Sequence, residues 1–405
     1  MNIIHPDFAA QILGDEERGG LAPWTYFNEE LFEIEQEELF RKHWQLACHV
    51  SDVPNAGDWC GFDIVGERAI VVRGKDNVVR AFHNVCRHRG SRVVAGERGN
   101  CKSAMVCPFH GWSYNLDGTL RAVPKAKTFP KLDPATHGLV PLEHEIWNGF
   151  VFVRFKPGPQ PSVAEIMMPH AEEARGYRLE EILPFAPQTR EAMGVNWKAV
   201  RDVDNEGYHV PIAHPALHDL YGQQYRDERS IGGVSRSEGR ISGISQRHWS
   251  VKNYVKLRPQ MAHLPEESRG RWVYFGMFPN LVIMLYPDLV GFYQEVPLGV
   301  GKTVQRMAYY RPPVDTREAR AARYLAHRID RMTGAEDTEL IKWSWESMQS
   351  SGFSGVILSD LEAGVRDYHD YLRRTIPVVA LDREPGNSQV KMINRTLIAA
   401  NGPSD

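Results

Sequence analysis

Two short segments of this 405-residue chain each place a cysteine beside a histidine. Cys86 and His88 form a Cys-x-His pair, and after eighteen intervening residues Cys107 and His110 form a Cys-x-x-His pair. Thiolates and imidazoles are side chains that bind soft and borderline metals. The fold must therefore bring two separate loops together around a metal, and this requirement constrains the chain more than any other feature.

Two kinds of metal centre accept two thiolates and two imidazoles. A structural zinc ion binds all four in a tetrahedron, but zinc fingers usually present a cysteine pair and then a histidine pair. Here each loop offers one cysteine and one histidine. This split favours a [2Fe–2S] cluster in which one iron takes both thiolates and the other takes both imidazoles. Gly90, Pro108 and Gly111 permit tight turns whose backbone N–H groups can point at the cluster sulfides.

The composition excludes several classes of protein. Hydrophobic residues make up 42% of the chain, charged residues 24%, and the formal net charge is −3. This balance argues against long disorder and provides no basic field for nucleic acid or a membrane surface. The most apolar stretch is too short to span a bilayer, and no secretory signal is visible. Cys48, Cys60 and Cys101 are expected to be ordinary thiols, and the protein is expected to be cytoplasmic.

The order of helical and strand-like segments predicts two domains. Residues 28–44 have apolar residues near helical spacing, with Asn28 as a cap, and we expect residues 1–44 to form a helical segment that packs with the second domain. Residues 45–157 contain short strands and tight turns, which predict a small all-β domain. Residues 158–405 combine strands with long helices and predict an α+β domain.

Local patterns also predict the individual elements. Strands of the small domain are expected at 69–73, 78–82, 112–116, 119–123 and 149–155. Strands of the second domain are expected at 271–278, 281–286, 291–296 and 303–310. Helical pieces broken at Pro211 and Pro215 are expected within 197–220, and helices are expected at 315–350 and 360–374. Because the four later strands follow one another through short turns, they predict an antiparallel sheet.

A second group of candidate metal ligands lies in the second domain. Two histidines and a carboxylate that leave coordination positions open form the facial triad of non-haem Fe(II) oxygenases. His209 and His214 are five residues apart, which on a regular helix points them about 140° from each other. Pro211 lies between them and is expected to distort the helix and turn both rings inward. Glu206 shares the helical face of His209, and His218, four residues after His214, is a competing ligand.

Both groups resemble the motifs of one family. The two cysteine–histidine loops, followed by Trp112, resemble the cluster motif of Rieske domains, although the gap between them is toward the long side for that family. The stretch from Asn196 to Pro215 resembles the catalytic signature of Rieske non-haem iron oxygenases, the ring-hydroxylating oxygenase α-subunit family. The resemblance implies an α+β fold with a small all-β Rieske [2Fe–2S] domain. It also implies a catalytic domain of the helix-grip (START-like) type, in which helices cover an antiparallel sheet.

The resemblance implies how electrons reach the active site. The implied cluster ligands are Cys86, His88, Cys107 and His110. Glu206 is implied as the bridge that links His209 to the cluster histidine His110 of a neighbouring subunit in a ring-shaped trimer. Many ring-hydroxylating dioxygenases have aspartate at the position of Glu206, and glutamate is more typical of the branch that oxidises quaternary amines such as carnitine and glycine betaine.

The resemblance also implies the ligands of a mononuclear Fe(II). His209 and His214 are two of them. The third, Asp337, is placed on a C-terminal helix, where the segment from Gly334 to Glu339 looks like the Glu-Asp element of the family. Asp360 and Asp202 are the alternatives to Asp337, since a carboxylate from elsewhere in the fold can also reach the site.

The implied function is the terminal oxygenase component of a Rieske-type system. The chain has no Gly-x-Gly-x-x-Gly motif and no plant-type Cys-x4-Cys-x2-Cys motif. Electrons from NAD(P)H are therefore expected to arrive through a separate reductase, with or without a ferredoxin. O2 is the co-substrate, and a small organic molecule is hydroxylated, dihydroxylated or N-demethylated.

The substrate is expected to be a quaternary amine or betaine, because aromatic residues between 216 and 310 can surround an ammonium group. An aromatic acid is the alternative substrate. A Rieske electron carrier and a zinc-stabilised binding protein are the other classes.

Overall fold

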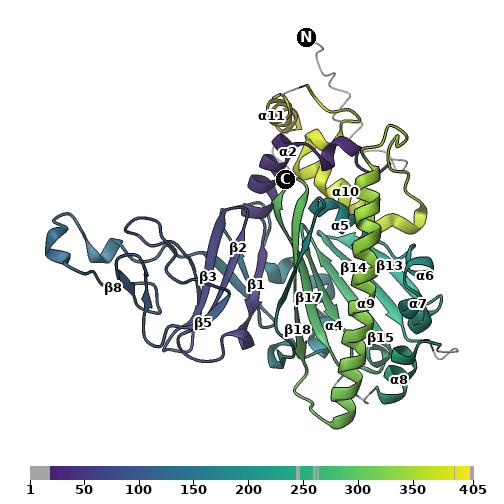
Figure 1. Cartoon of the computed structure of the whole chain (residues 1–405), viewed down its shortest axis with the longest axis horizontal. Coiled ribbons are helices and arrows are strands. Elements are labelled where there is room, and N and C mark those ends of the chain that lie inside the picture. Colours follow the sequence, from purple (N-terminus) through teal and green to yellow (C-terminus); the bar gives the residue numbers. More distant parts are fainter. Residues whose placement is uncertain (1–18, 243–246, 259–260, 262–263, 387, 402–405) are drawn as a thin grey trace. The chain divides into compact units, whose positions relative to one another are not determined.

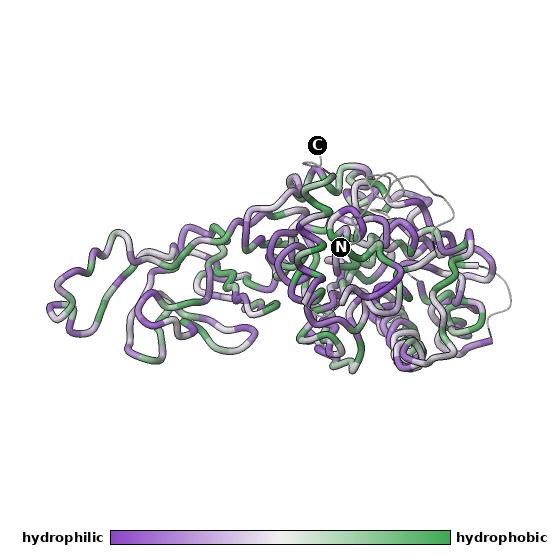
Figure 2. Tube along the Cα trace, turned by 90° about the horizontal axis from the view of Figure 1, so that it is seen from above, coloured by the Kyte–Doolittle hydropathy of each residue, from purple (hydrophilic) through white to green (hydrophobic). Residues whose placement is uncertain are grey.

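The computed structural model describes residues 19–242, 247–258, 261, 264–386 and 388–401 (Figure 1). The chain folds into two compact units. One is Phe40–Pro184, called here the small unit, and the other combines Met1–Leu39 with Phe185–Asp405 and is called the large unit. Hydrophobic and hydrophilic residues alternate along the trace of both (Figure 2). Within the described residues, no helix has the length and apolar character needed to cross a membrane.

The small unit is built from antiparallel strands. One sheet has the order β4-β3-β2-β5, a second β1-β10-β9 and a third β6-β7-β8. The strands are β1 (Gln45–His49), β2 (Asp58–Ile64), β3 (Glu67–Arg73), β4 (Val79–His83), β5 (Arg98–Asn100), β6 (Met105–Val106), β7 (Ser113–Tyr114), β8 (Leu120–Ala122), β9 (Glu143–Trp147), β10 (Phe150–Arg154) and β11 (Leu183–Pro184). Both predicted hairpins are present, as β3 with β4 and β7 with β8. Gly118 turns the second with a φ of 87°, a conformation that favours glycine.

The small unit extends further along the chain than the predicted domain, which ends at residue 157. Two short helices follow its strands, α3 (Val163–Ile166) and α4 (Ala171–Gly176). The backbone N–H of Trp44 donates to the Gln160 side chain at 2.8 Å, and the buried His49 ring lies 3.0 Å from the carbonyl of Leu179. These contacts join residues that are far apart in the sequence, so local patterns do not reveal them.

One antiparallel sheet forms the centre of the large unit. Its order is β18-β17-β16-β15-β14-β13, and β12 pairs with the other edge of β18. The strands are β12 (Thr189–Met193), β13 (Tyr225–Ile231), β14 (Val234–Arg240), β15 (Arg271–Met277), β16 (Leu281–Leu285), β17 (Val290–Gly299) and β18 (Lys302–Arg311). The four predicted strands are β15 to β18. β12, β13 and β14 were not predicted, because these strands carry charged residues in place of an apolar pattern. The charges of β13 and β14 pair along the sheet, as Arg236 does with Glu228 and Glu238.

Helices pack against this sheet, and α9 runs across it in Figure 1. The helices are α2 (Glu29–Glu35), α5 (Trp197–Asp204), α6 (Val210–Ala213), α7 (Pro215–Tyr221), α8 (Trp249–Leu257), α9 (Arg317–Ser347), α10 (Ala363–Thr375) and α11 (Val390–Asn401). Leu325 and Ile329 of α9 share one core cluster with Trp272 and Met284 of the sheet. Burial of such side chains stabilises the fold by roughly 1.5–3 kcal/mol each.

The N-terminal helix is tied to α5 by buried polar contacts. Asn28 caps α2 as predicted, accepting from the backbone N–H of Leu31 at 2.7 Å, and the helix continues as the π-helix Gln36–Arg41. Glu35 accepts from Lys198 at 2.5 Å and from the Trp197 ring at 2.8 Å, and both charged groups are buried. This pair fixes the start of α5, the helix that leads into the candidate metal ligands.

Candidate functional site

Three side chains from two regions of the large unit converge on one point. Nε2 of His214 lies 3.1 Å from Nε2 of His209 and 2.9 Å from Oδ1 of Asp337. Nε2 of His209 lies 3.6 Å from the same oxygen. Two imidazole nitrogens and a carboxylate oxygen at these distances can hold one metal ion, and they are the donor set of a facial triad.

The backbone at His214 brings the two histidines together. α6 starts immediately after His209, and His214 leaves the helix with φ −122° and ψ 78°. A residue that precedes proline disfavours the helical conformation, and Pro215 follows His214. The expected distortion at Pro211 is wrong, because Pro211 lies in the first turn of α6, where proline is tolerated. The break lies at the His214–Pro215 step, where the sequence also predicts one.

A carboxylate lies against the other ring nitrogen of each histidine. Glu206 lies 2.5 Å from Nδ1 of His209, and it also accepts from the backbone N–H of His209 at 3.1 Å. Glu336 lies 2.9 Å from Nδ1 of His214. Because an ionised carboxylate can only accept, each Nδ1 carries the proton and each Nε2 presents a lone pair. Burial lowers the pKa of His214, but Asp337 and Glu336 outweigh it and raise the pKa, so positive charge, from a proton or a metal ion, is favoured at Nε2.

The convergence point fits a cation. With both Nδ1 atoms protonated, Nε2 of His209, Nε2 of His214 and Oδ1 of Asp337 are three acceptors that face one another. Oδ1 of Asp337 is buried, and no residue in the described part of the chain donates a hydrogen bond to it. Buried acceptors in mutual contact are costly unless a positive charge lies among them. The three residues therefore fit a divalent metal such as Fe(II).

The competing ligands lie elsewhere. Of the described residues, neither His218 nor Asp360 nor Asp202 joins His209 and His214 in a group of close ligand atoms. Asp202 is occupied by His369, at 2.8 Å, and by the hydroxyl of Tyr26. Asp360 opens a short helical turn, Asp360–Glu362. Asp337 is the candidate that the fold brings to the two histidines.

The two cysteine–histidine loops share one backbone conformation. In each loop the glycine four residues after the cysteine donates its N–H to the cysteine carbonyl at 3.0 Å, Gly90 to Cys86 and Gly111 to Cys107. The two glycines have φ of 74° and 73°, a conformation that favours glycine. The expected tight turns are present, and they make the loops near copies of each other.

The four side chains of these loops segregate by type. Cys86 and Cys107 are buried and interact with each other. The His88 and His110 rings lie 4.6 Å apart at 75°, with His110 exposed. No three of the four, all of them among the described residues, have ligand atoms within 4.8 Å of one another. Ligand atoms of a tetrahedral zinc lie only about 3.5 Å apart, so the arrangement favours a cluster with thiolates on one iron and imidazoles on the other.

The environment of Cys86 and His88 also fits a cluster. The Tyr114 hydroxyl accepts from the backbone N–H of Arg87 at 2.9 Å and lies 3.2 Å from Sγ of Cys86, to which it can donate. Burial raises the pKa of Cys86, so its thiolate requires a nearby positive charge such as iron. Nδ1 of His88 is buried, and no described residue forms a hydrogen bond with it.

Another group of close ligand atoms in the described part of the chain is Cys48, Asp52 and Cys60. Asp52 already pairs with Arg98 at 2.9 Å and accepts from the backbone N–H of His49. Its carboxylate is therefore satisfied by the protein, which is consistent with ordinary buried thiols at Cys48 and Cys60 as expected.

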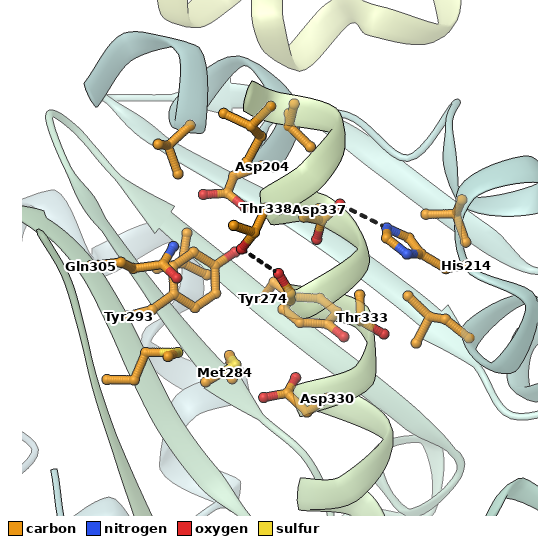
Figure 3. A pocket seen from close by; sticks show the side chains of 18 of the residues that line it. Asp204, His214, Tyr274, Met284, Tyr293, Gln305, Asp330, Thr333, Asp337 and Thr338 are labelled. Carbon is orange, nitrogen blue, oxygen red and sulfur yellow. Dashed lines mark hydrogen bonds and ion pairs between the residues drawn. The ribbon is translucent and has the colours of Figure 1, made fainter. Parts of the chain in front are cut away.

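A cavity of about 210 Å³ opens beside His209, His214 and Asp337. Its walls are rich in tyrosines and carboxylates, namely Tyr225, Tyr274, Tyr293, Tyr309, Glu191, Asp204, Glu206, Asp330 and Asp337. Arg331, which is exposed, is the only lysine or arginine among the described residues that line it. Figure 3 shows Asp330 and Asp337 pointing into this space from α9. The lining favours a small molecule with positive charge.

Comparisons with known proteins agree with this arrangement. The model of the Rieske [2Fe-2S] domain matches residues 43–133, and that of the ring hydroxylating alpha subunit (catalytic domain) matches residues 171–377. The carnitine monooxygenase oxygenase subunit of Escherichia coli (strain K12) is 32% identical over 386 residues, which cover 92% of this chain and 98% of that protein. The chain belongs to the ring-hydroxylating oxygenase α-subunit family. It is thus an oxidoreductase, a Rieske oxygenase subunit.

A further relative and a solved structure are also similar to this Rieske oxygenase. The glycine betaine monooxygenase oxygenase subunit of Pseudomonas aeruginosa (strain UCBPP-PA14) is 33% identical over 192 residues, 47% of this chain and 44% of that protein. A solved quaternary ammonium Rieske monooxygenase matches with a TM-score of 0.76 at 22% identity, over 92% of this chain and 98% of that one. The predicted fold class, a Rieske domain with an α+β catalytic domain, is confirmed.

Two residues near the candidate iron ligands of the Rieske oxygenase were not predicted from the sequence. Glu336 belongs to the segment 334–339 but was assigned no role, because its contact with His214 depends on how α9 is rotated. Asp330 lies two turns earlier on α9, where the sequence suggests only a surface helix. The seven-residue spacing from Asp330 to Asp337 could have revealed Asp330, because on a helix this spacing places both side chains on the same face.

Proposed function

We propose that this protein is the terminal oxygenase of a quaternary-amine monooxygenase system and acts in the cytoplasm. The observation that carries the proposal is the cavity beside His209, His214 and Asp337, whose tyrosines and carboxylates suit a small cation. Carnitine and glycine betaine monooxygenase subunits are similar to the chain, and the first is similar over nearly its whole length. Electrons would come from NAD(P)H through a separate reductase, with or without a ferredoxin.

Separate groups of residues would hold the two metal centres and the substrate. Cys86, Cys107, His88 and His110 would hold the [2Fe–2S] cluster. His209, His214 and Asp337 would hold Fe(II). When bound, the cluster supplies single electrons and the mononuclear iron supplies the activation of O2. Glu206 and Glu336 would hold one proton on Nδ1 of each iron-binding histidine and leave Nε2 to the metal, and the cavity would position the substrate.

Glu206 would pass electrons toward His209 from the cluster of a neighbouring subunit in a homotrimer. Its contact with Nδ1 of His209 supports this role, since it places a carboxylate on the iron ligand. An exposed apolar side chain lies at each end of the route: Ile212, near the iron histidines in sequence, is 89% exposed, and Phe109, next to His110, is 55% exposed. Exposed apolar side chains at such places favour burial by a second copy.

A test of the proposed function compares substrates under steady supply of electrons. The iron-loaded protein with a reductase and NADH is given carnitine, glycine betaine or choline, and O2 uptake and product are measured. Oxidation of one of these amines, with about three irons per chain, is expected. If iron is found only in the cluster, the protein is an electron carrier and not an oxygenase.

An aromatic acid is the second candidate substrate, because Arg331 at the cavity can pair with a carboxylate. Benzoate and 3-hydroxybenzoate are therefore included in the same assay. Turnover of these acids without turnover of any amine would overturn the quaternary-amine proposal while leaving the oxygenase class intact.

A further inference from the structure

Asp330 places a second carboxylate on the cavity face of α9. It lies seven residues before Asp337, which corresponds to two helical turns and about 10.5 Å along the axis. Both side chains line the cavity (Figure 3). Tyr274 lies close enough to both carboxylates for each of them to raise its pKa, together with burial, the larger cause. The space between Asp330 and the candidate iron ligand is therefore bordered by a tyrosine.

Tyrosine hydroxyls hold the Asp330 carboxylate on both oxygens. Tyr286 and Tyr309 each donate to one oxygen at 2.6 Å. The hydroxyls of Tyr286 and Tyr274 lie 3.2 Å apart, and when the single proton of Tyr286 is donated to Asp330, Tyr286 can accept from Tyr274. Tyr274 can accept in turn from Tyr221 at 3.0 Å. The tyrosine hydroxyls can thus donate in series toward Asp330, an arrangement that favours a negatively charged carboxylate.

In the part of the chain that the structure describes, no cationic side chain balances this carboxylate. Among the described residues, no lysine, arginine or histidine forms an ion pair with Asp330. Burial raises the pKa of Asp330, and the Asp337 carboxylate raises it further, against the lowering effect of Tyr286 and Tyr309. A buried carboxylate without a counter-ion is costly, and the cost is recovered when a cation binds beside it.

We propose that Asp330 is the residue that recognises the positive charge of the substrate, a role that rests on the proposed function and deepens it. The cationic head group lies between Asp330 and the iron-binding residues, against the ring of Tyr274. Aromatic rings attract cations, but they also accept a neutral group of the same shape, because ring contact is largely apolar. The carboxylate adds discrimination by charge. An anionic aromatic acid is disfavoured at the same place by like-charge repulsion.

The experiment compares a cation with its neutral carbon isostere. Choline and 3,3-dimethyl-1-butanol have the same shape and differ in charge. Their binding to the full-length protein, loaded with cluster and Fe(II) and kept anaerobic, is measured by calorimetry. The variants are Asp330→Asn and, as a control, Glu318→Gln, which makes the same charge change on an exposed part of α9.

Wild type and the control are expected to bind choline more tightly than the isostere. In the Asp330→Asn variant, choline affinity falls on the order of tenfold, while affinity for the isostere stays the same. Equal binding of the two probes by wild type, or a choline preference that survives in Asp330→Asn, would overturn the proposal. The visible spectrum of the cluster and the melting temperature report whether the variant folds.

A second variant keeps the test decisive if Asp330→Asn does not fold. Tyr309→Phe removes one hydroxyl that holds the carboxylate and leaves a ring of nearly the same size. It is expected to weaken choline binding several-fold with no change for the isostere, and an unchanged choline preference would count against Asp330.

Failure of the proposed function would look different. Choline would then bind in an Asp330-dependent way without O2-dependent product. Conversely, amine oxidation with a charge preference that ignores Asp330 would refute only the inference about this residue.

Discussion

The carboxylate of Glu336 lies 2.9 Å from Nδ1 of His214. The next residue of α9, Asp337, lies 2.9 Å from the opposite ring nitrogen of the same histidine. Two adjacent residues of one helix thus approach His214 from both sides. The first fixes which nitrogen carries the proton, and the second supplies a candidate ligand.

Replacing Glu336 with glutamine is expected to weaken iron binding. The amide keeps the size of the side chain but loses the negative charge that stabilises the proton on Nδ1 of His214. Loss of such a partner typically costs 10- to 100-fold in metal affinity. Competition for Fe(II) with a chelator measures this loss, and the cluster spectrum should not change. Glu339→Gln, on the exposed side of α9, is the control; equal iron affinity in both variants would contradict the role of Glu336.

Replacing Glu206 with glutamine is expected to slow electron transfer at saturating Fe(II), with both metal centres loaded. Glu206 is the polar side chain that contacts Nδ1 of His209, and the proposal routes electrons through it. Stopped-flow absorption follows reoxidation of the reduced cluster by O2 with substrate present. An undiminished reoxidation rate in a fully loaded variant would argue against the bridge. Glu318→Gln serves as the matched charge control.

Replacing Tyr114 with phenylalanine is expected to lower the reduction potential of the cluster. The Tyr114 hydroxyl lies 3.2 Å from Sγ of Cys86, and a hydrogen bond to sulfur stabilises the reduced state, in which the cluster carries more negative charge. Loss of one such bond corresponds to a shift of about 40–60 mV. Protein-film voltammetry measures the potential. Ser113→Ala, which removes an exposed hydroxyl in the same strand, should leave it unchanged.

The small unit is expected to lose stability in acid because of His49. Burial lowers the pKa of His49 to about 4, against its ordinary value near 6.5. The unfolded chain therefore binds a proton at His49 that the folded chain does not bind between these two values, so stability falls as pH drops from about 6.5 to about 4. The loss attributable to this residue is on the order of 2–3 kcal/mol.

Chemical unfolding at pH 7 and pH 4.5 tests this expectation. His49→Gln should show a smaller difference between the two pH values than wild type, even if it is less stable at both. His137→Gln, a change at a more exposed histidine of the same unit, should keep the difference seen in wild type. An unchanged difference in His49→Gln would show that other groups control the acid sensitivity.

The order of residues within two short segments was sufficient to predict the two cysteine–histidine loops. Their ligands lie within a few residues of each other, and the glycine that each turn requires is part of the same segment. The apolar strands β15 to β18 were predictable for a related reason, since short apolar runs between turns indicate buried strands. The predicted roles of Cys86, His88, Cys107 and His110 as cluster ligands follow from that local order.

Tertiary structure decided the features that join distant segments. The rotation of α9 turns Asp330 and Asp337 toward a cavity whose tyrosines come from strands, and it turns Glu336 toward His214. The polar strand β13 has no apolar pattern to reveal it. The end of the small unit likewise depends on contacts such as that of His49 with Leu179. A spacing of a few residues constrains which side chains are neighbours in a loop, whereas contacts across more than a hundred residues depend on how complete elements pack.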